Sequence, residues 1–166
     1  MREDAHTVLT KLVQGSHRCF ATQGIGIQTE REKLSGTPYA AVWCCSDQRP
    51  DPEVLFDAPE GGLFVVQTSP TWPSMAVSAS IDYAASQLKI PLLVVLGHHG
   101  CKLSNRDSYF RSDNGNSERP KGGFDRAFVE EAVRTFRFEG EFHGPLEIVG
   151  AYLRANGQVE FFGNDQ

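Results

Sequence analysis

Residues 91–101 read PLLVVLGHHGC, an apolar run that ends in two histidines and a cysteine. Two other short apolar runs precede it, at residues 39–44 and 63–68. Each run is rich in valine, alanine or leucine and apolar on both faces, which is typical of strands buried in a parallel sheet. We therefore expect three parallel strands, the third of them spanning residues 91–97.

Helical periodicity separates these strands. Apolar residues recur at helical spacing up to Gly15, which predicts a short amphipathic helix over residues 4–14. Ser74 is suited to cap a helix over the following residues to about 88, which would complete a β-α-β crossover. A wide aromatic stripe over residues 124–136 predicts another helix after a pair of glycines. Residues 19–37 contain several glycines among charges and are expected to be mostly loop.

The end of the chain has a different pattern. Two apolar stretches, residues 146–153 and 158–162, flank an Asn-Gly pair at Asn156 and Gly157. Asn-Gly favours the positive φ angles of a tight hairpin turn. The expected fold is therefore α/β, a mainly parallel central sheet flanked by helices with a C-terminal antiparallel hairpin, in one domain over residues 1–166. Residues 104–121 are polar throughout and fit either an ordered lid or a mobile segment.

Composition excludes several classes of function. The chain has 166 residues, 40% of them hydrophobic, and a net charge of −5 without a run of Lys or Arg, so nucleic acid is not an expected partner. No apolar run approaches the roughly 18 residues that a membrane span needs, and the N-terminus does not resemble a secretory signal. Four cysteines without disulfide-scaffold spacing suit a reducing compartment. We expect a soluble, cytoplasmic protein.

Two polar clusters follow the first and third expected strands. The first contains Cys45, Asp47 and Arg49, and the second contains His98 and Cys101. If these strands are neighbours, their carboxyl ends bring a thiolate from one loop to an imidazole and a thiolate from the other. Cys, His and Cys suit Zn²⁺ and leave a fourth position for water or substrate, as in catalytic zinc sites.

Simpler interpretations of these residues stay open. His98 and Cys101 alone fit a core histidine beside a buried thiol, and Asp47 with Arg49 fits an exposed ion pair worth at most about 1 kcal/mol. Cys44 and His99 are expected to pack rather than ligate, because neighbouring strand residues point to opposite faces.

The two clusters resemble the signatures of the β-class carbonic anhydrases. Cys-Ser-Asp-Gln-Arg at residues 45–49 is similar to the family's Cys-Ser-Asp-Ser-Arg, and residues 97–101 match its Gly-His-x-x-Cys. The resemblance extends over nearly the whole chain, through residues 52–66, 80–84, 93–97, 149–152 and 157–161.

This resemblance implies one Zn²⁺ per chain, held by Cys45, His98 and Cys101, with Asp47 as a further ligand in the resting state. It implies that Arg49 pairs with Asp47 when the carboxylate leaves the metal. The implied activity is reversible hydration of CO₂ to bicarbonate by a zinc-bound hydroxide. It also implies a homodimer or higher homo-oligomer, with the N-terminal helix laid across the neighbouring subunit.

The chain also departs from the family around this site. The usual Arg-Asn-Ala-Gly-Asn after the second strand is replaced by Gln-Thr-Ser-Pro-Thr at residues 67–71, a glycine by Lys102, and a substrate-facing glutamine by Gly36. Two alternatives therefore remain: hydrolysis of carbonyl sulfide or carbon disulfide on the same fold, and a zinc-binding homologue without turnover. His99 and His143 are candidates for carrying the proton to solvent.

Overall fold

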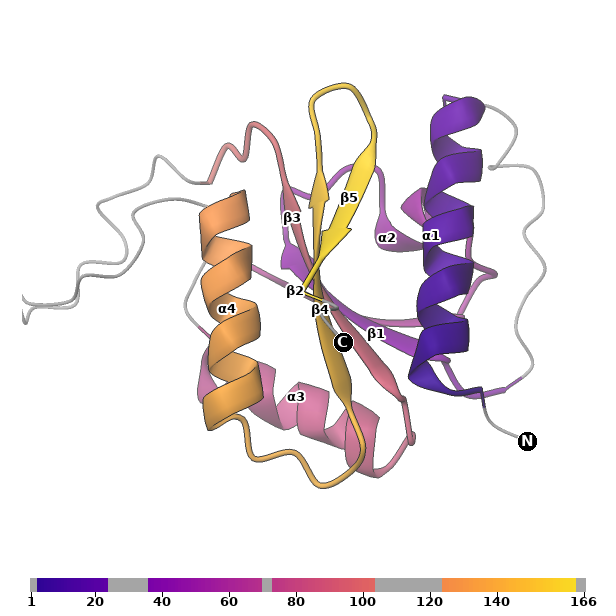
Figure 1. Cartoon of the computed structure of the whole chain (residues 1–166). Coiled ribbons are helices and arrows are strands. Elements are labelled where there is room, and N and C mark those ends of the chain that lie inside the picture. The colour runs from indigo at the N-terminus through magenta and orange to yellow at the C-terminus, as the bar shows by residue number, and fades with distance from the viewer. Residues whose placement is uncertain (1–2, 24–35, 70–72, 104–123, 164–166) are drawn as a thin grey trace, which may run out of the picture.

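A single twisted sheet forms the centre of the protein (Figure 1). The structure is a computed structural model that describes residues 3–23, 36–69, 73–103 and 124–163. In this part of the chain, five strands lie in the order β2-β1-β3-β4-β5. The strands are β1 (Ala40–Cys45), β2 (Leu63–Thr68), β3 (Leu92–His98), β4 (Glu147–Leu153) and β5 (Val159–Phe162). The first three are mutually parallel and β5 is antiparallel to β4, as the sequence predicts, while the sequence left open that β4 is parallel to β3.

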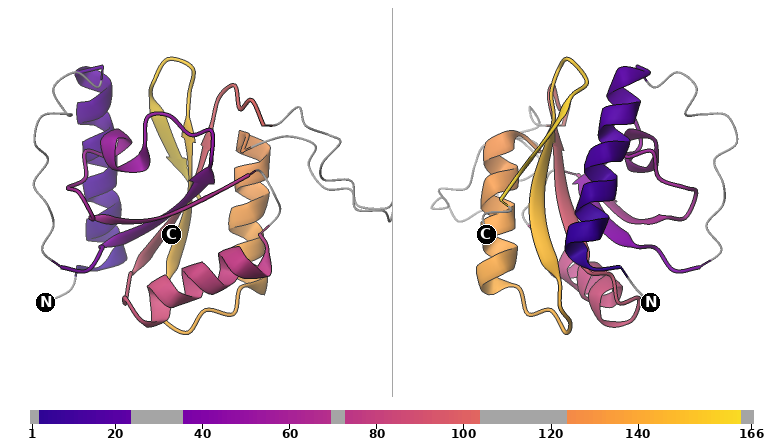
Figure 2. Two further views of the ribbon diagram at one scale, coloured as in Figure 1. Left: turned by 180° about the vertical axis from the view of Figure 1, so that it is seen from behind. Right: turned by 45° about the vertical axis from the view of Figure 1, so that its right-hand side comes forward.

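Helices cover both faces of this sheet (Figures 1 and 2). Helix α1 (Ala5–Ala21) and the short α2 (Pro52–Leu55) pack on one face, and α3 (Met75–Ser86) and α4 (Arg126–Glu139) pack on the other. Alternation along β1 supplies both cores, because Val42 and Cys44 join the α1 side while Trp43 and Cys45 join the α3 and α4 side. The domain therefore has three layers with two hydrophobic cores.

The two helices on the second face begin at side-chain caps. The Ser74 hydroxyl accepts a hydrogen bond from the Val77 backbone N–H, and Asp125 accepts one from Phe128. The aromatic stripe of α4 then packs around Trp43, whose ring lies 5.4 Å from that of Phe136 in an edge-to-face arrangement. Both helices thus confirm the sequence prediction.

Helix α1 is longer than the sequence predicts. It continues through Gly15 to Ala21, so the prediction that it ends at residue 14 and that residues 19–21 are loop was wrong. A Cβ on Gly15 would lie 1.8 Å from the carbonyl oxygen of Phe56. This glycine therefore allows α1 to approach α2 closely and does not end the helix.

Helix α1 also packs on its own sheet. Val8 and Leu12 are fully buried in the core that contains β1 and β3. The expectation that this helix also lies across a neighbouring subunit stays a prediction. Burial of its apolar face against its own strands satisfies its amphipathic pattern.

Two other details differ from the sequence prediction. Strand β2 is the edge of the sheet and is only half-buried, with Val65 exposed, so it is not apolar on two covered faces. In the final hairpin only Gly157 has a positive φ, of 89°, while its N–H donates to the Arg154 carbonyl. The turn is thus a three-residue loop with glycine at its left-handed position, and Asn156 does not adopt a positive φ.

The polar segment at residues 104–121 lies outside the described residues. No helix in the described ranges is long and apolar enough to cross a membrane.

Candidate metal centre

Strands β1 and β3 carry the two polar clusters to one edge of the sheet. The strands are parallel neighbours, with Cys44 paired to Leu96, so Cys45 and His98 end them side by side. Cys101 follows after a turn in which Gly100 has a φ of 67°, a conformation that glycine adopts without strain. Residues far apart in the sequence are therefore brought together at the carboxyl ends of two strands, as expected.

Cys45, His98 and Cys101 form a compact group of metal-ligand type. One ligand atom from each lies within 4.8 Å of the others, and all three residues are buried. The two Sγ atoms are 3.5 Å apart. Two thiolates on a tetrahedral Zn²⁺ with bonds of about 2.3 Å would lie roughly 3.7 Å apart. The spacing therefore fits a tetrahedral metal held by both sulfurs.

The imidazole of His98 supports the same assignment. Its Nδ1 lies 3.2 Å from the carbonyl oxygen of His99, a contact that favours the proton on Nδ1. Nε2 then carries the lone pair, and this buried atom has no hydrogen-bond partner. Buried polar atoms are rarely left unpaired, so the orphaned nitrogen beside two thiols fits a metal ligand.

Burial also acts on the Cys45 thiol. Desolvation raises its pKa to about 12, and the Asp47 N–H, which donates to its Sγ at 3.3 Å, opposes part of this effect. The neighbouring Cys101 thiol raises it further. A bound cation would reverse this balance, because metal ligation requires and stabilises the thiolate.

Asp47 and Arg49 lie beside this group but have other partners. Oδ2 of Asp47 accepts a hydrogen bond of 2.8 Å from the backbone N–H of Lys102, and its carboxylate is not among the three clustered ligands. The guanidinium of Arg49 is exposed and forms its ion pair with Asp51, at 3.5 Å. Among the described residues, no ion pair joins Asp47 to Arg49.

Lys102 contacts the candidate site in a way that the sequence alone does not reveal. Its backbone amide connects the loop after β3 to the carboxylate in the loop after β1. Because every residue except proline offers the same N–H, the side-chain sequence contains no signal for this contact.

The remaining candidates lie away from the group. Cys44 is buried in the core on the opposite face, as predicted, and burial raises its pKa to about 12. His99 is exposed, so the expectation that it packs was wrong. His143 binds Asp82 near the amino end of β4, at the far end of the sheet. Gly36 precedes the amino end of β1 and does not line the group within this chain.

Comparison with known proteins identifies the family. Residues 40–131 match the family model described as carbonic anhydrase. The carbonic anhydrase of Mycolicibacterium smegmatis is 48% identical over 64 residues, which cover 39% of this chain and 31% of that protein. Carbonic anhydrase 2 of Mycobacterium tuberculosis is 43% identical over 68 residues, covering 41% and 33%. The chain thus aligns with about a third of the length of these relatives.

Solved structures agree at the level of the fold. The carbonic anhydrase of Streptococcus mutans has a TM-score of 0.62 at 18% identity, covering 89% of this chain and 96% of the other. A β-carbonic anhydrase of Aspergillus fumigatus, CafD, has a TM-score of 0.53 at 19% identity, covering 82% and 95%. Two tetrameric β-carbonic anhydrases are described from Sordaria macrospora, with a TM-score of 0.52 at 17% identity and 95% coverage of both chains.

The sheet order and the Cys-His-Cys group thus define an α/β protein with a candidate metal centre at its strand ends. The chain belongs to the carbonic anhydrase family, and its fold is that of the β-carbonic anhydrases.

Proposed function

We propose that this protein catalyses the zinc-dependent, reversible hydration of CO₂ to bicarbonate. The observation that carries the proposal is the buried, unpartnered Nε2 of His98 beside the thiols of Cys45 and Cys101. Membership of the carbonic anhydrase family supports it. Three protein ligands are the number that leaves a zinc ion with one position for water or substrate.

In this proposal, Cys45, His98 and Cys101 hold one Zn²⁺ per chain. When bound, zinc supplies a nucleophile at neutral pH, because it lowers the pKa of coordinated water to about 7. The His99 carbonyl fixes the His98 ring, and the Asp47 N–H supports the Cys45 sulfur, so both ligands are oriented by the backbone.

We propose that Asp47 handles the proton. Its Oδ2 is occupied by the Lys102 amide, which leaves Oδ1 to accept a hydrogen bond or a proton. Asp47 becomes a fourth ligand at rest, as the family resemblance implies, only if its carboxylate moves toward the three clustered ligands. We propose that Arg49 then accepts the carboxylate when it leaves the metal, in exchange for its exposed contact with Asp51.

The experiment is CO₂ hydration by stopped flow, run beside elemental analysis of the same preparation. The proposal expects one zinc per chain and turnover that Cys101→Ser abolishes together with the zinc. A parallel assay of sulfide release from carbonyl sulfide tests the substrate, because the ligands do not distinguish these two linear molecules. If sulfide release dominates, carbonyl sulfide replaces CO₂ as the proposed substrate. A zinc-loaded protein that turns over neither molecule would contradict an enzymatic role.

We also propose that the protein works as a homo-oligomer in the cytoplasm. Among the described residues, no strand pairs with the outer edge of β2, where Val65 is exposed, and such edges are templates for pairing with another chain. Sordaria macrospora relatives of the same fold are described as tetrameric. A reducing compartment suits four cysteines that form no disulfide in the described residues. Light scattering coupled to gel filtration measures the assembly, and a mass of one chain would contradict it.

A further inference from the structure

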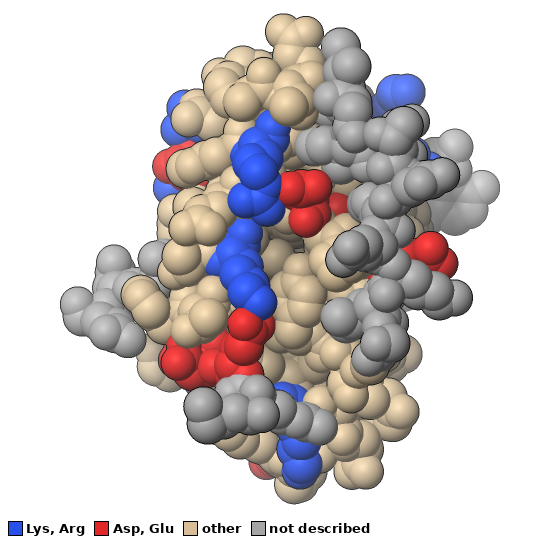
Figure 3. Space-filling view, turned by 90° about the vertical axis from the view of Figure 1, so that its right-hand side faces the viewer, with Lys and Arg blue, Asp and Glu red and all other residues tan. Residues whose placement is uncertain are grey.

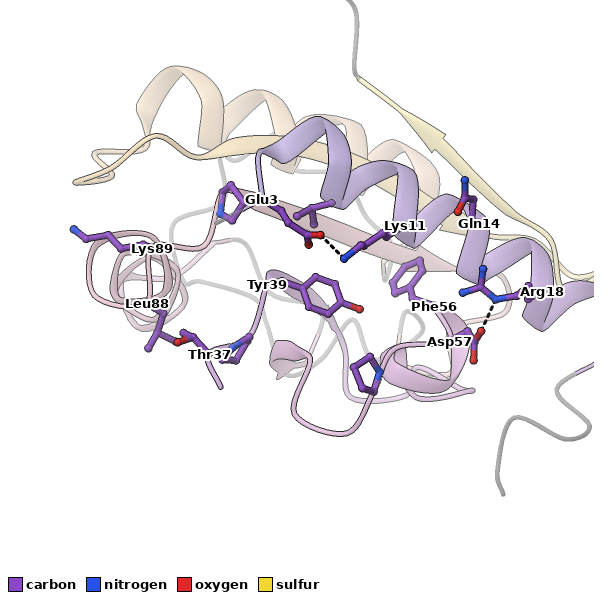
Figure 4. A pocket seen from close by; sticks show the side chains of 14 residues that line it. Glu3, Lys11, Gln14, Arg18, Thr37, Tyr39, Phe56, Asp57, Leu88 and Lys89 are labelled. Atoms are coloured by element: carbon purple, nitrogen blue, oxygen red, sulfur yellow. Dashed lines mark hydrogen bonds and ion pairs between the residues drawn. The ribbon is translucent and has the colours of Figure 1, made fainter. Parts of the chain in front are cut away.

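A cavity lies at the opposite end of the sheet from the candidate metal centre. It has a volume of about 650 Å³ and opens beneath α1, next to Tyr39 and Pro91, which precede β1 and β3 (Figure 4). Cys45 and His98 end the same two strands. Six residues of strand at about 3.3 Å each separate the two places by roughly 20 Å. The cleft is therefore distinct from the candidate active site.

Aromatic side chains line the middle of this cleft. Figure 4 shows the Tyr39 ring between α1 and the segment after α2, with Phe56 beside it. Phe56 is buried, whereas Tyr39 is half-buried and carries the ammonium of Lys11 at 5.6 Å from its ring centroid. Small-molecule sites of this size typically combine such an apolar surface with a few placed polar groups. The aromatic floor suits a flat, unsaturated ligand.

Cations are in excess over carboxylates along the walls. Lys11 pairs with Glu3 and Arg18 pairs with Asp57, while Lys89 has no ion pair among the described residues. Figure 3 shows Lys and Arg side chains in a row on this side of the molecule. This local balance contrasts with the net charge of −5 on the whole chain. The wall therefore favours an anionic group over a cationic one.

These cations are oriented and still accessible. Their carboxylate partners restrain the Lys11 and Arg18 side chains, which remain 50% and 56% exposed. An ammonium has three donors and a guanidinium has five, so both keep N–H groups for a ligand. Burial, and then nearby carboxylates, raise the pKa of Tyr39 to about 12, so its hydroxyl remains a proton donor at neutral pH.

We propose that this cleft binds a small aromatic carboxylate, whose ring lies on Tyr39 and whose carboxylate is bound by Lys11. Restrained donors lose little freedom on binding, which favours a specific site. An inorganic anion would use the charges but not the aromatic floor. The ligand would bridge α1 and the start of β1, and its binding does not depend on the proposed activity.

The test uses 2-naphthoate as the probe and the zinc-loaded full chain. Titration calorimetry measures affinity, and amide chemical shifts in NMR spectra locate the site. We expect shifts at the amides of α1 and of residues 37–39, with weaker binding of acetate. Lys11→Gln should raise the Kd about tenfold, as loss of one charge-assisted hydrogen bond implies. Arg134→Gln, an exposed cation on α4, is the matched control and should not change the Kd.

Tyr39→Leu tests the aromatic floor separately from the charges. It should weaken 2-naphthoate while leaving acetate unchanged, and the Tyr39→Phe variant should keep most of the naphthoate affinity because it keeps the ring. Circular dichroism checks that each variant is folded. Binding that Lys11→Gln leaves unchanged and azide abolishes would place the probe on the metal and overturn the proposal. Absence of binding up to about 10 mM would also overturn it.

Discussion

Cys44 and Cys45 are adjacent in the chain, yet they lie in different cores of the molecule. Strand alternation turns Cys45 toward His98 and Cys101, and it turns Cys44 toward α1 and α2. Cys45→Ser should therefore lose the zinc, because a hydroxyl is a poor substitute for a thiolate.

Cys44→Ala should keep one zinc per chain and lose only about 1 kcal/mol of unfolding free energy from the small cavity. Elemental analysis and urea unfolding of both variants measure the contrast. Zinc bound to Cys45→Ser but absent from Cys44→Ala would reverse the assignment of the two thiols.

Asp47 has one oxygen bound to the Lys102 amide, and among the described residues the other oxygen has no hydrogen-bond partner. Asp47→Asn keeps the shape of the side chain but loses the negative charge. It should lower kcat/KM for CO₂ by about a hundredfold or more, the usual size of a lost proton acceptor, while zinc stays bound.

Arg49→Ala should lower kcat/KM for CO₂ by less than Asp47→Asn does, because Arg49 forms its ion pair with Asp51 rather than with Asp47. Stopped-flow rates beside zinc analysis compare the two variants. An Asp47→Asn enzyme with unchanged kcat/KM would remove Asp47 from the mechanism.

Tyr39 provides a pH-dependent contribution to stability. Burial, with the carboxylates of Glu3, Glu53 and Asp57, raises the pKa of its phenol from 10 to about 12. The unfolded phenol ionises first, so the stability linked to this group is complete below pH 10. It is lost as the pH rises from 10 toward 12.

Unfolding free energy should therefore fall in this alkaline window, and less steeply in Tyr39→Phe. Urea titrations at several pH values measure the difference. Absorbance titration of tyrosinate shows whether one tyrosine of the folded protein ionises at higher pH than a free phenol. A wild-type slope equal to that of Tyr39→Phe would contradict the raised pKa.

At the scale of elements, Gly97 sets the position of α4 against β3. A Cβ at this residue would lie 2.5 Å from the carbonyl oxygen of Phe124 and 2.6 Å from Cγ2 of Val129. The neighbouring His98 N–H donates to that same carbonyl at 2.9 Å. Gly97→Ala should therefore lose about 1–3 kcal/mol of unfolding free energy and weaken zinc binding, because the shift reaches the metal ligand.

Gly100→Ala is the matched comparison in the same loop. No atom lies within 4 Å of a Cβ there, but the φ of 67° disfavours alanine. Its cost should be backbone strain of about 1 kcal/mol. Thermal unfolding of Gly97→Ala and Gly100→Ala, with and without zinc, compares the two variants. Equal losses of stability and of zinc binding would show that steric contact is not what Gly97 avoids.

Local patterns predicted most elements and missed what depends on contacts between elements. The capped helix after Ser74 and the aromatic stripe of α4 are local signals, and both helices lie where the sequence predicts. Gly15 carries the usual signal for a helix end, but its role is the close approach of α1 to Phe56, which only the folded chain reveals. The half-exposed surface of β2 depends on the order of strands, which its own apolar sequence does not contain.

The candidate site divides in the same way. Cys45, His98 and Cys101 were predicted because metal ligands are side chains of particular types, and the sequence shows them directly after the expected strands. The Lys102 amide that binds Asp47 and the outward ion pair of Arg49 were not predicted, because backbone donors and exposed rotamers leave no pattern in the sequence.

For the whole molecule, the proposed zinc site predicts that metal binding and folding are coupled. Zinc should bind the folded ligand group far more tightly than the dispersed residues of the unfolded chain, and it therefore stabilises the fold. Removal of zinc with a chelator should lower the thermal unfolding midpoint by several degrees, as a loss of a few kcal/mol implies. Calorimetry before and after chelation measures this effect, with Cys101→Ser as the control that should not respond. An unchanged midpoint in the wild-type protein would show that zinc is not held by this group.

The two sulfurs that approach each other at 3.5 Å are 56 residues apart in the sequence, with the whole crossover through β2 and α3 between them. During folding, a chain that has formed only β1 has positioned Cys45 but not yet His98 or Cys101. Closing a loop of this length costs entropy. We therefore expect the ion to bind only after β3 has paired with β1. Zinc would then act late in folding, equivalent to a cross-link worth roughly 4 kcal/mol by loop closure, and uptake of the metal would mark the moment at which β3 is paired with β1.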